Sequence, residues 1–386
     1  MSTVINTRSP FYKKISNASL SYAKLELYVW TGVYADRVAA SKKYTLTKEE
    51  LGTNNYVTFE LSELIRDYMI TEYNDYATDT LWVDADITIY DSAGAIVQVG
   101  GQDTTIYPFL AIDGYGYFED GINPRSVEYS TPMVMQNNTD IYYYGGYDIK
   151  IPIYAEAATV TATLTSTAGA NIFWENADEF WDTYDVTWGS GQTPVVITDN
   201  GNTNQKIQYL IITDTESLND GDYVTISSTN SAYADVIIKL NKVCEPKYTP
   251  LSAIFYNKYG ALQNLWFFKK SMTDISISSN KFKNNIIDFD NSGGSPSYSL
   301  SKHQEKIFMS NGKESIVMNT GFYDESFNEV IRQMLLSEQV WVYDGTNTLP
   351  INLKSNTLQF KKGVNDKLIS YTVQFDYAFD KINNIQ

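Results

Sequence analysis

Ala23-Lys-Leu-Glu-Leu-Tyr-Val-Trp30 alternates apolar and polar side chains, so that Leu25 and Leu27 share one face and Lys24 and Glu26 the other. A period of two residues is that of a β-strand with one buried face. The same pattern recurs along the chain of 386 residues, whereas helix patterns are few. The sequence therefore predicts a mainly β protein. Its length predicts two or three domains.

Residues 1–125 are predicted to form an N-terminal β-sandwich with one or two short helices. Asp91-Ser-Ala-Gly94 is a turn signal between two strand patterns. Further strands in this part are expected at residues 56–60, 81–90 and 96–100.

Two places in the same part carry helix signals. Thr47 and Glu50 have the spacing of a capping box, and because Gly52 follows closely we expect one helical turn at most. Residues 62–69 are predicted to form a short helix over one end of a sheet.

Residues 126–246 differ from the rest in charge, with four basic and sixteen acidic residues and a net charge of −12. Asn-, Asp- and Gly-rich turns separate the strand patterns, which predicts a second, acidic β-sandwich that could be an insertion. Strands are expected at residues 158–166, 206–213, 222–228 and 235–240. Pro246 and Pro250 mark the next boundary.

Residues 247–386 carry a net charge of +2 and contain the strongest helix pattern of the chain. Residues 368–377 alternate cleanly as a strand, and a second strand is expected at residues 340–343. We predict a C-terminal α+β domain in which one helix packs on an antiparallel sheet. The apolar stripe of that helix is expected to be core and consists of Phe327, Val330, Ile331, Met334 and Leu335.

The composition excludes several classes of function. The net charge of −17, from 29 basic and 46 acidic residues, argues against a protein that coats DNA or binds it sequence-specifically. A single cysteine, Cys244, and a single histidine, His303, leave no disulfide framework, zinc cluster or paired-histidine site within one chain. A Ser/His/Asp triad needs His303, and no Gly-x-Ser-x-Gly motif accompanies it. We therefore expect no enzyme activity, no catalytic residues, no metal site and no cofactor.

The sequence shows no stretch that approaches 18 apolar residues, so no transmembrane helix and no membrane partner are expected. The first residues lack the apolar segment of a signal peptide, which predicts a soluble chain that is made in a cytoplasm and whose final location is a separate matter.

Aromatic residues suggest a surface for partners. The chain has 31 tyrosines, and residues 173–188 mix aromatic rings with carboxylates, as a glycan-binding cleft or a glycosidase does. The rest of the chain is equally rich in Tyr beside Asp, so this run is more typical of solvated loops and interfaces. The candidate partner or glycan surface consists of Tyr142, Tyr143, Tyr144, Trp174, Trp181 and Trp188.

A chain of β modules rich in tyrosine, with no catalytic set of residues, is typical of a subunit that buries much of its surface against neighbours. The contrast between −12 in residues 126–246 and +2 in residues 247–386 would orient copies head to tail. Head-to-tail contacts are heterologous and can close into a ring. We therefore expect the chain to be its own partner in a ring.

Several segments resemble virion proteins of Bacteroidetes phages, in particular the tail proteins of crAss-like phages, which are short-tailed viruses of gut bacteria. The resemblance covers about the first 120 and the last 140 residues, and the acidic middle part matches nothing that we can place. The segments that carry it are Val4-Ile-Asn-Thr-Arg-Ser-Pro-Phe-Tyr12, residues 23–32, 59–68, 255–268 and 335–341, and Asn365-Asp-Lys-Leu-Ile-Ser-Tyr-Thr-Val-Gln-Phe-Asp-Tyr377 with its continuation to residue 385.

The resemblance implies a structural protein of the viral tail, made in the host cytoplasm and located in the virion. We expect a tail hub, whose last domain builds a closed ring and whose partners are other tail proteins: rings, muzzle and fibres. A collar ring protein of the neck is an alternative, and a glycan-binding or fibre-type host adhesin is another. An acidic lumen would repel DNA phosphates and let the genome pass.

Overall fold

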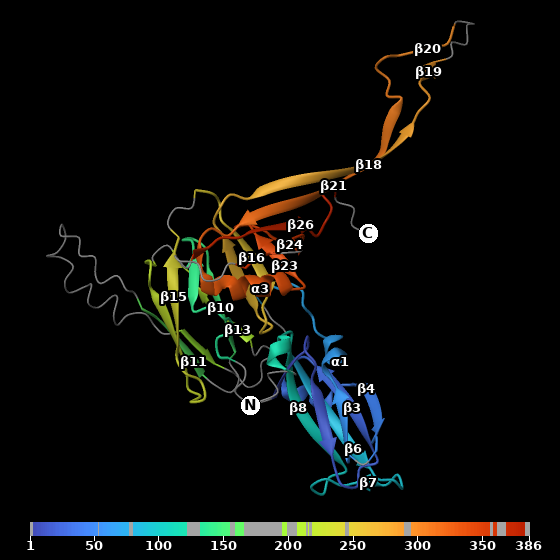
Figure 1. The fold of residues 1–386 in the computed structure, drawn as a ribbon, viewed down its shortest axis with the longest axis vertical. Helices are drawn as coiled ribbons and strands as arrows, with labels where there is room; N and C mark the ends of the chain where they lie inside the picture. The colour runs from blue at the N-terminus through green and yellow to red at the C-terminus, as the bar shows by residue number, and fades with distance from the viewer. Residues whose placement is uncertain are drawn as a thin grey trace, which may run out of the picture. The chain divides into compact units, whose positions relative to one another are not determined.

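The computed structural model divides the chain into two compact units, each assembled from separate segments (Figure 1). Unit 1 comprises Met1–Pro246, Ala253–Trp266 and Ser326–Gln339. Unit 2 comprises Lys247–Ser252, Phe267–Glu325 and Val340–Gln386. The structure describes residues 3–52, 54–76, 80–121, 132–154, 159–165, 195–198, 207–213, 215, 218–243, 247–288, 295–355, 358–360 and 368–382.

Unit 1 begins with a six-stranded sheet of order β1-β8-β6-β3-β4, to which β7 adds beside β6. All its neighbours are antiparallel except β1 and β8, which are parallel. The strands are β1 (Thr3–Asn6), β3 (Tyr22–Trp30), β4 (Lys42–Glu49), β6 (Leu81–Tyr90), β7 (Ile96–Val97) and β8 (Thr104–Ile112).

A second layer covers one face of this sheet. The antiparallel pair β2 (Tyr12–Ser16) and β5 (Tyr56–Glu60) leads into helix α1 (Ser62–Arg66). Their apolar side chains, such as Phe59 and Ile65, share one buried core with Leu25 and Leu27 of β3. The alternation in residues 23–30 therefore buries the predicted face. Short 3₁₀ helices follow β3 (Tyr34–Val38) and β8 (Phe118–Asp120).

The next part of unit 1 is built in the same way from two sheets. The larger has the order β12-β11-β14-β15-β9 and the smaller pairs β10 with β13. Leu210 of β13 and Ile226 of β14 lie in one buried core. The strands are β9 (Asp140–Tyr143), β10 (Ile149–Tyr154), β11 (Thr159–Thr165), β12 (Val195–Thr198), β13 (Ile207–Ile212), β14 (Tyr223–Ser228) and β15 (Val236–Lys242).

A third core joins these two parts of unit 1. Trp82 and Ile112 of the first sheet are buried together with Tyr154 of β10 and Ala261. Ala261 belongs to the turn between β16 (Leu251–Tyr256) and β17 (Leu262–Phe267). Three chain segments that are distant in sequence therefore share this core.

Helix α3 (Asn328–Leu336) completes unit 1 and follows a 3₁₀ turn, Glu325–Phe327. It lies near the antiparallel sheet of β15 and β14, because the Phe327 ring meets the edge of the Tyr142 ring with centroids 5.3 Å apart. At its other end Ser337 Oγ accepts a hydrogen bond from the Tyr256 backbone N–H at 3.2 Å. The predicted C-terminal helix beside an antiparallel sheet is thus confirmed, in a mainly β protein.

Unit 2 contains an antiparallel sheet of order β23-β24-β26-β21-β18. Two short pairs accompany it, β22 with β25 and β19 with β20. The strands are β18 (Met272–Lys283), β19 (Ile287–Asp288), β20 (Ser297–Tyr298), β21 (Glu305–Asn319), β22 (Tyr323–Asp324), β23 (Val340–Tyr343), β24 (Thr348–Leu353), β25 (Leu368–Ile369) and β26 (Thr372–Tyr377).

Three local expectations need correction. Residues 47–50 form no helical turn and lie in or directly after β4, because Leu46 of that strand packs against the N-terminal core. The strand expected at residues 96–100 ends at Val97. Leu335 is only half-buried, although the other four residues of its stripe are buried as predicted. The three domain ranges expected from the sequence remain a prediction.

Candidate assembly surface

The most exposed regular structure in the described chain is a two-stranded β-ribbon of unit 2. Strands β18 and β21 pair from Met272 and Val317 out to Lys283 and Glu305. Strand β26 pairs with β21 only from Ser315 to Asn319, so beyond that point β21 has no third strand among the described residues. Figure 1 shows the pair leaving the other strands of unit 2. We call residues 272–319 the arm.

The C-terminal segment supports only the base of the arm. The Lys381 backbone N–H donates to the Gly312 carbonyl at 2.7 Å, and Asn311 Nδ2 donates to Asp380 at 2.6 Å. The remaining outer part, Ser278–Lys283 with Glu305–Ser310, is a ribbon of two strands alone within the described residues. Because an isolated two-stranded ribbon is at best marginally stable in water, the arm gains stability when another surface covers it.

One face of the arm carries a row of exposed apolar side chains. Residues directly opposite each other point to the same face, and Ile275 and Ile277 of β18 share a face with Ile307, which lies opposite Lys281. Phe308 is the extra residue of a bulge beside Ile307 and is 78% exposed. We call Ile275, Ile277, Ile307 and Phe308 the apolar stripe.

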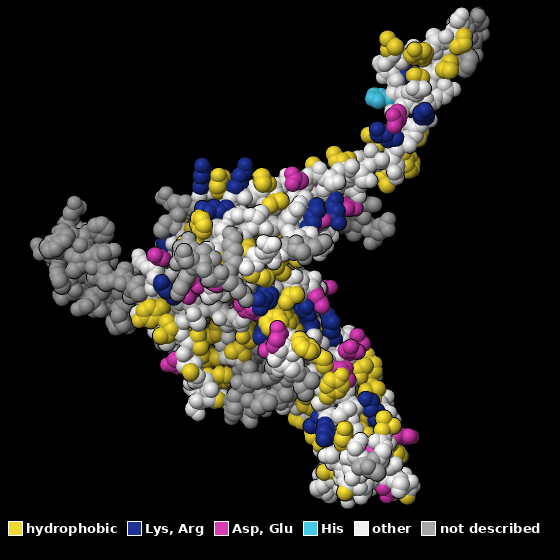
Figure 2. All heavy atoms as spheres, in the orientation of Figure 1, with side chains coloured by type: hydrophobic (Ala, Val, Ile, Leu, Met, Phe, Trp, Pro, Cys, Tyr) yellow, Lys and Arg dark blue, Asp and Glu magenta, His cyan; other side chains and the backbone are white. Residues whose placement is uncertain are grey.

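The other face begins as a polar surface. Ser276 lies opposite Lys313, and Ser278 lies opposite Asn311. All twelve residues of β18 are exposed, as are residues 305–310 of β21, so the described chain leaves the outer part of the arm uncovered on both faces. Figure 2 shows hydrophobic side chains in yellow along the projecting ribbon, together with basic side chains in blue and an acidic one in magenta. Farther out, the same face carries Met309, opposite Asn280, and Phe282, opposite Lys306, both exposed. The ribbon therefore exposes apolar side chains on both faces.

Three carboxylates of the arm are paired with lysines. Lys281 lies 3.6 Å from Glu305, Lys302 lies 2.5 Å from Asp288, and Lys381 lies 3.0 Å from Glu314. Additional arm lysines, at positions 283, 306 and 313, make no ion pair within the described residues. Lys306 and Lys313 lie on the face of Ser276, opposite the apolar stripe. With five basic and five acidic residues in residues 272–319, the arm has no net charge.

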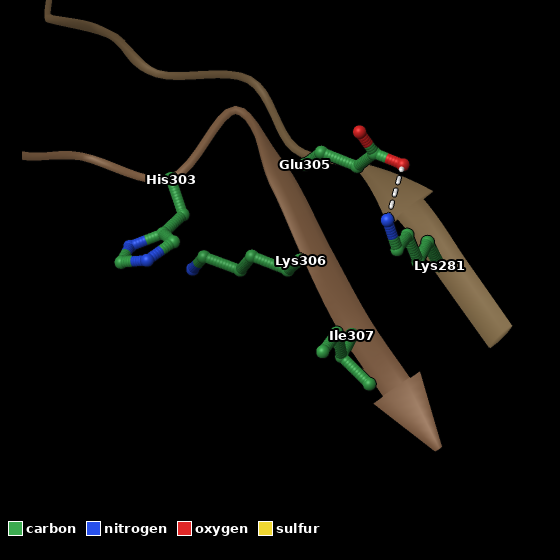
Figure 3. Close-up of a pocket in the computed structure, with 5 residues that line it drawn as sticks. All are labelled: Lys281, His303, Glu305, Lys306 and Ile307. Atoms are coloured by element: carbon green, nitrogen blue, oxygen red, sulfur yellow. Dashed lines mark ion pairs between the residues drawn. The ribbon is translucent and has the colours of Figure 1, made fainter. Parts of the chain in front are cut away.

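His303 lines an open pocket of about 500 Å³ at the outer end of the arm, together with Lys281, Glu305, Lys306 and Ile307 (Figure 3). Lys306 extends toward the His303 ring, and Lys281 is ion-paired with Glu305. These five side chains include no hydroxyl or thiol. The described lining of this pocket therefore offers no Ser, Thr or Cys side chain to serve as the nucleophile of a Ser/His/Asp-type triad.

The predicted tyrosine cluster lies at the second sheet of unit 1 and is not one continuous exposed surface. Tyr143 is buried in the core, and Tyr142 and Tyr144 are half-buried. Tyr142 contacts Phe327, as described above, and the Tyr144 ring lies 5.9 Å from that of Tyr147. Only Tyr142 and Tyr144 keep exposed ring surface for a partner. Trp174, Trp181 and Trp188 lie outside the described residues.

A polar joint forms where the end of α3 meets two earlier segments of unit 1. Glu338 accepts hydrogen bonds from Arg66 at 2.6 Å and lies 3.5 Å from Arg8 Nε. Burial alone would raise the pKa of Glu338, but the hydrogen bond from Arg66 and the two positive charges outweigh it and lower that pKa. Burial raises the pKa of nearby Asp113, which Arg8 partly opposes. The joint ties three segments together.

A second ion-pair network fixes the 3₁₀ turn after β3 to its sheet. Arg37 Nε lies 2.9 Å from Asp84, and its Nη2 lies 2.8 Å from Asp86. The guanidinium also lies 3.4 Å from the Tyr28 ring centroid. Burial raises the pKa of Asp84, and the hydrogen bond from Arg37 offsets part of that rise.

Within the described residues, no group of three or more His, Cys, Asp and Glu side chains is placed to hold a metal ion. None of the described helices has the length and apolar character needed to cross a membrane. No protein-family model matches the chain, and no curated protein matches it.

The arm is the exposed structural feature that sequence reasoning missed. Its signals are the Ile-Ser-Ile-Ser alternation at residues 275–278 and the turn-forming run Asn-Ser-Gly-Gly-Ser-Pro at residues 291–296, between the two halves of the ribbon. Such a short alternation is also compatible with a loop, so the pattern alone did not indicate an exposed ribbon.

Proposed function

We propose that the chain is a structural subunit of the tail of a short-tailed bacteriophage. In this role it acts as the tail hub, a ring of identical copies that links the portal-side rings to the muzzle and fibres around a passage for DNA. It performs no chemical turnover and acts by its shape and its contacts.

The exposed arm is the observation that carries this proposal. A protein that works alone rarely exposes four large apolar side chains in one stripe on a two-stranded ribbon, because exposed apolar patches promote association. In a tail, every subunit contacts neighbours of its own kind and of other kinds, so such a ribbon is covered after assembly. The resemblance of the flanking sequence segments to crAss-like phage tail proteins supports the same role.

The charge of the chain fits a DNA passage. A net charge of −17 gives a ring of many copies a strongly negative field, and a negative lumen does not hold phosphates. The rings expected to bind glycans, Trp174, Trp181 and Trp188, lie outside the described residues, so no observation favours the adhesin alternative.

Immunogold electron microscopy of intact virions, with an antibody raised to the full chain, tests the proposal. Gold at the tail axis below the neck supports a hub, whereas gold at the neck identifies a collar ring. Gold on peripheral fibres overturns the hub assignment in favour of an adhesin. No labelling of intact or disrupted virions, with a control antibody to the portal protein positive, overturns a role in the virion.

A further inference from the structure

We propose that the free edge of strand β18 pairs, antiparallel, with the β18 edge of a second copy of this chain. The two ribbons then form one sheet of four strands, in which the two β18 strands are central and a twofold axis passes beside Ser276. A contact of this kind is isologous and joins copies in pairs. It is separate from the proposed ring, whose head-to-tail contacts need a different surface, and it does not rest on the proposed function.

The edge of β18 that faces away from β21 has no partner among the described residues. Strand β18 is the last strand of its sheet, and all twelve of its residues are exposed. In an antiparallel pair, every second residue directs its backbone N–H and C=O groups away from the neighbouring strand. A row of such groups along Met272–Lys283 is a template for a further strand, because an extended backbone offers donors and acceptors at the same spacing.

The chain protects a comparable edge but leaves this one open. Strand β4 is an outer strand of the first sheet, and it carries three lysines among eight residues. Charged side chains, lysine above all, are a usual means by which an edge strand avoids pairing. The nine residues Met272–Asn280 of β18 include neither lysine nor proline, and Asp274 is their one charged residue. This edge therefore lacks the side chains that prevent strand addition.

The side chains of β18 form a pattern that reads nearly the same in both directions from Ser276. Two copies related by a twofold axis perpendicular to the sheet keep their equivalent faces on the same side, and residues opposite each other share a face. With Ser276 opposite its own copy, Ile275 lies opposite Ile277 in both halves of the contact. Thr273 then lies opposite Ser279, a favourable cross-strand pair. No other antiparallel register gives both isoleucines an isoleucine partner.

Pairing also removes the weakness of the isolated ribbon. A two-stranded ribbon is at best marginally stable in water, whereas three or more strands with an apolar face support one another. Ile275 and Ile277, which are 54% and 67% exposed, adjoin those of the second copy and are partly withdrawn from water. Over Met272–Asn280 no like charges lie opposite each other, because Asp274 lies opposite Ser278. The contact therefore gains backbone hydrogen bonds and apolar burial together.

A cysteine beside the twofold axis tests the register. In a full chain whose one native cysteine is replaced, Cys244→Ser, the substitution Ser276→Cys brings two thiols opposite each other, at a Cα separation of about 4.5–5.5 Å that a disulfide spans. Ser278→Cys is the matched control on the same face, because its two copies are four residues apart along the strands, or about 14 Å.

We expect Ser276→Cys to form covalent dimers in oxidised glutathione and Ser278→Cys to remain monomeric. Equal yields from the two variants, a higher yield from Ser278→Cys, or no dimers from either overturn the inference. Since both residues are exposed, the variants should fold, which circular dichroism and thermal unfolding check.

Charge variants of the parent chain test the same register without a covalent bond. Ser276→Asp sets two carboxylates opposite each other across the axis, although each also faces Lys313 within its own copy. Ser278→Lys sets a lysine opposite Asp274 of the second copy. In sedimentation velocity over a range of concentrations, we expect Ser276→Asp to weaken dimerisation up to about fivefold and Ser278→Lys to strengthen it.

Shifts of the dimer dissociation constant in the same direction for both charge variants, or no shift in either, overturn the inference. A parent chain that is monomeric at every soluble concentration also overturns it. Virion labelling is independent of these results. Gold at the tail axis, together with a chain that gives no Ser276→Cys cross-link, leaves the hub standing and removes the pairing of the β18 edges.

Discussion

Substitution of Gly260 by alanine measures how closely the β16–β17 turn approaches the first sheet of unit 1. Gly260 has φ +76°, and a Cβ built there would lie 2.8 Å from the Asp113 carbonyl carbon and 3.0 Å from the Gly114 nitrogen. Both neighbours are backbone atoms, so relief of the clash requires the turn or the end of β8 to move.

Gly94 provides a matched control. It has φ +78° in the turn after β6, and a Cβ there meets nothing within 4 Å. An alanine held in the left-handed backbone region costs about 1–2 kcal/mol in the folded state. Alanine also reduces the conformational entropy of the unfolded chain, which offsets about 0.4–1 kcal/mol of that cost. Gly94→Ala should therefore destabilise by about 1 kcal/mol. Gly260→Ala should add an overpacking term of about 1–3 kcal/mol, for a total of about 2–4 kcal/mol.

Urea unfolding followed by tryptophan fluorescence is a suitable assay, because six of the seven tryptophans lie in the segments of unit 1. The free energy of unfolding of each variant is compared with that of the parent chain at equal m-values. Hydrogen exchange should increase around the β16–β17 turn in Gly260→Ala and remain unchanged there in Gly94→Ala. Equal destabilisation by the two substitutions would refute the close approach.

Three further changes test other contacts. Arg37→Ala leaves the buried carboxylate of Asp84 without its positively charged partner. It should lower the free energy of unfolding by about 3 kcal/mol at neutral pH, and by less in acid, where Asp84 becomes protonated. Urea unfolding at two pH values measures both. Met334→Asp buries an unpaired charge and should abolish the unfolding transition of unit 1, whereas Leu335→Asp, at a half-buried position, should only lower its midpoint. The pKa of Glu338 is lower in the folded chain than in the unfolded chain. Its ionised carboxylate therefore stabilises the folded state above the unfolded-state pKa, and this stabilisation is lost as the pH falls through the folded-state pKa. Glu338→Gln should make the decrease in melting temperature below about pH 4.5 less steep, which a series of thermal melts at different pH values measures.

Sequence patterns predicted best those elements that bury one face. Strand β3 and helix α3 appear where the alternation and the apolar stripe placed them, because burial and periodicity act together there. The last strand pattern, residues 368–377, buries the expected face at Ile369 and Val373. It is nevertheless interrupted at Ser370 and Tyr371, where the chain passes from β25 to β26.

The errors have physical causes. A capping-box spacing is a local signal, and at residues 47–50 the packing of β4 beside β3 prevailed over it. The arm escaped prediction because none of the residues of β18 is buried, so no core face sets its pattern. The polar joint joins Arg8, Arg66 and Glu338, which are far apart in sequence, and only the fold brings them together.

The segmented construction of unit 1 has a consequence for synthesis on the ribosome. Its last segment, Ser326–Gln339, is made well after Pro246, and α3 within it supplies buried residues. At roughly 5–20 residues per second, the 93 residues from 246 to 339 take about 5–19 s. During that interval the strands of residues 1–246 are already made, the segment Ala253–Trp266 follows, and α3 is still missing. The nascent chain therefore exposes apolar surface for seconds, and a chaperone that binds it then would raise the yield of native subunits.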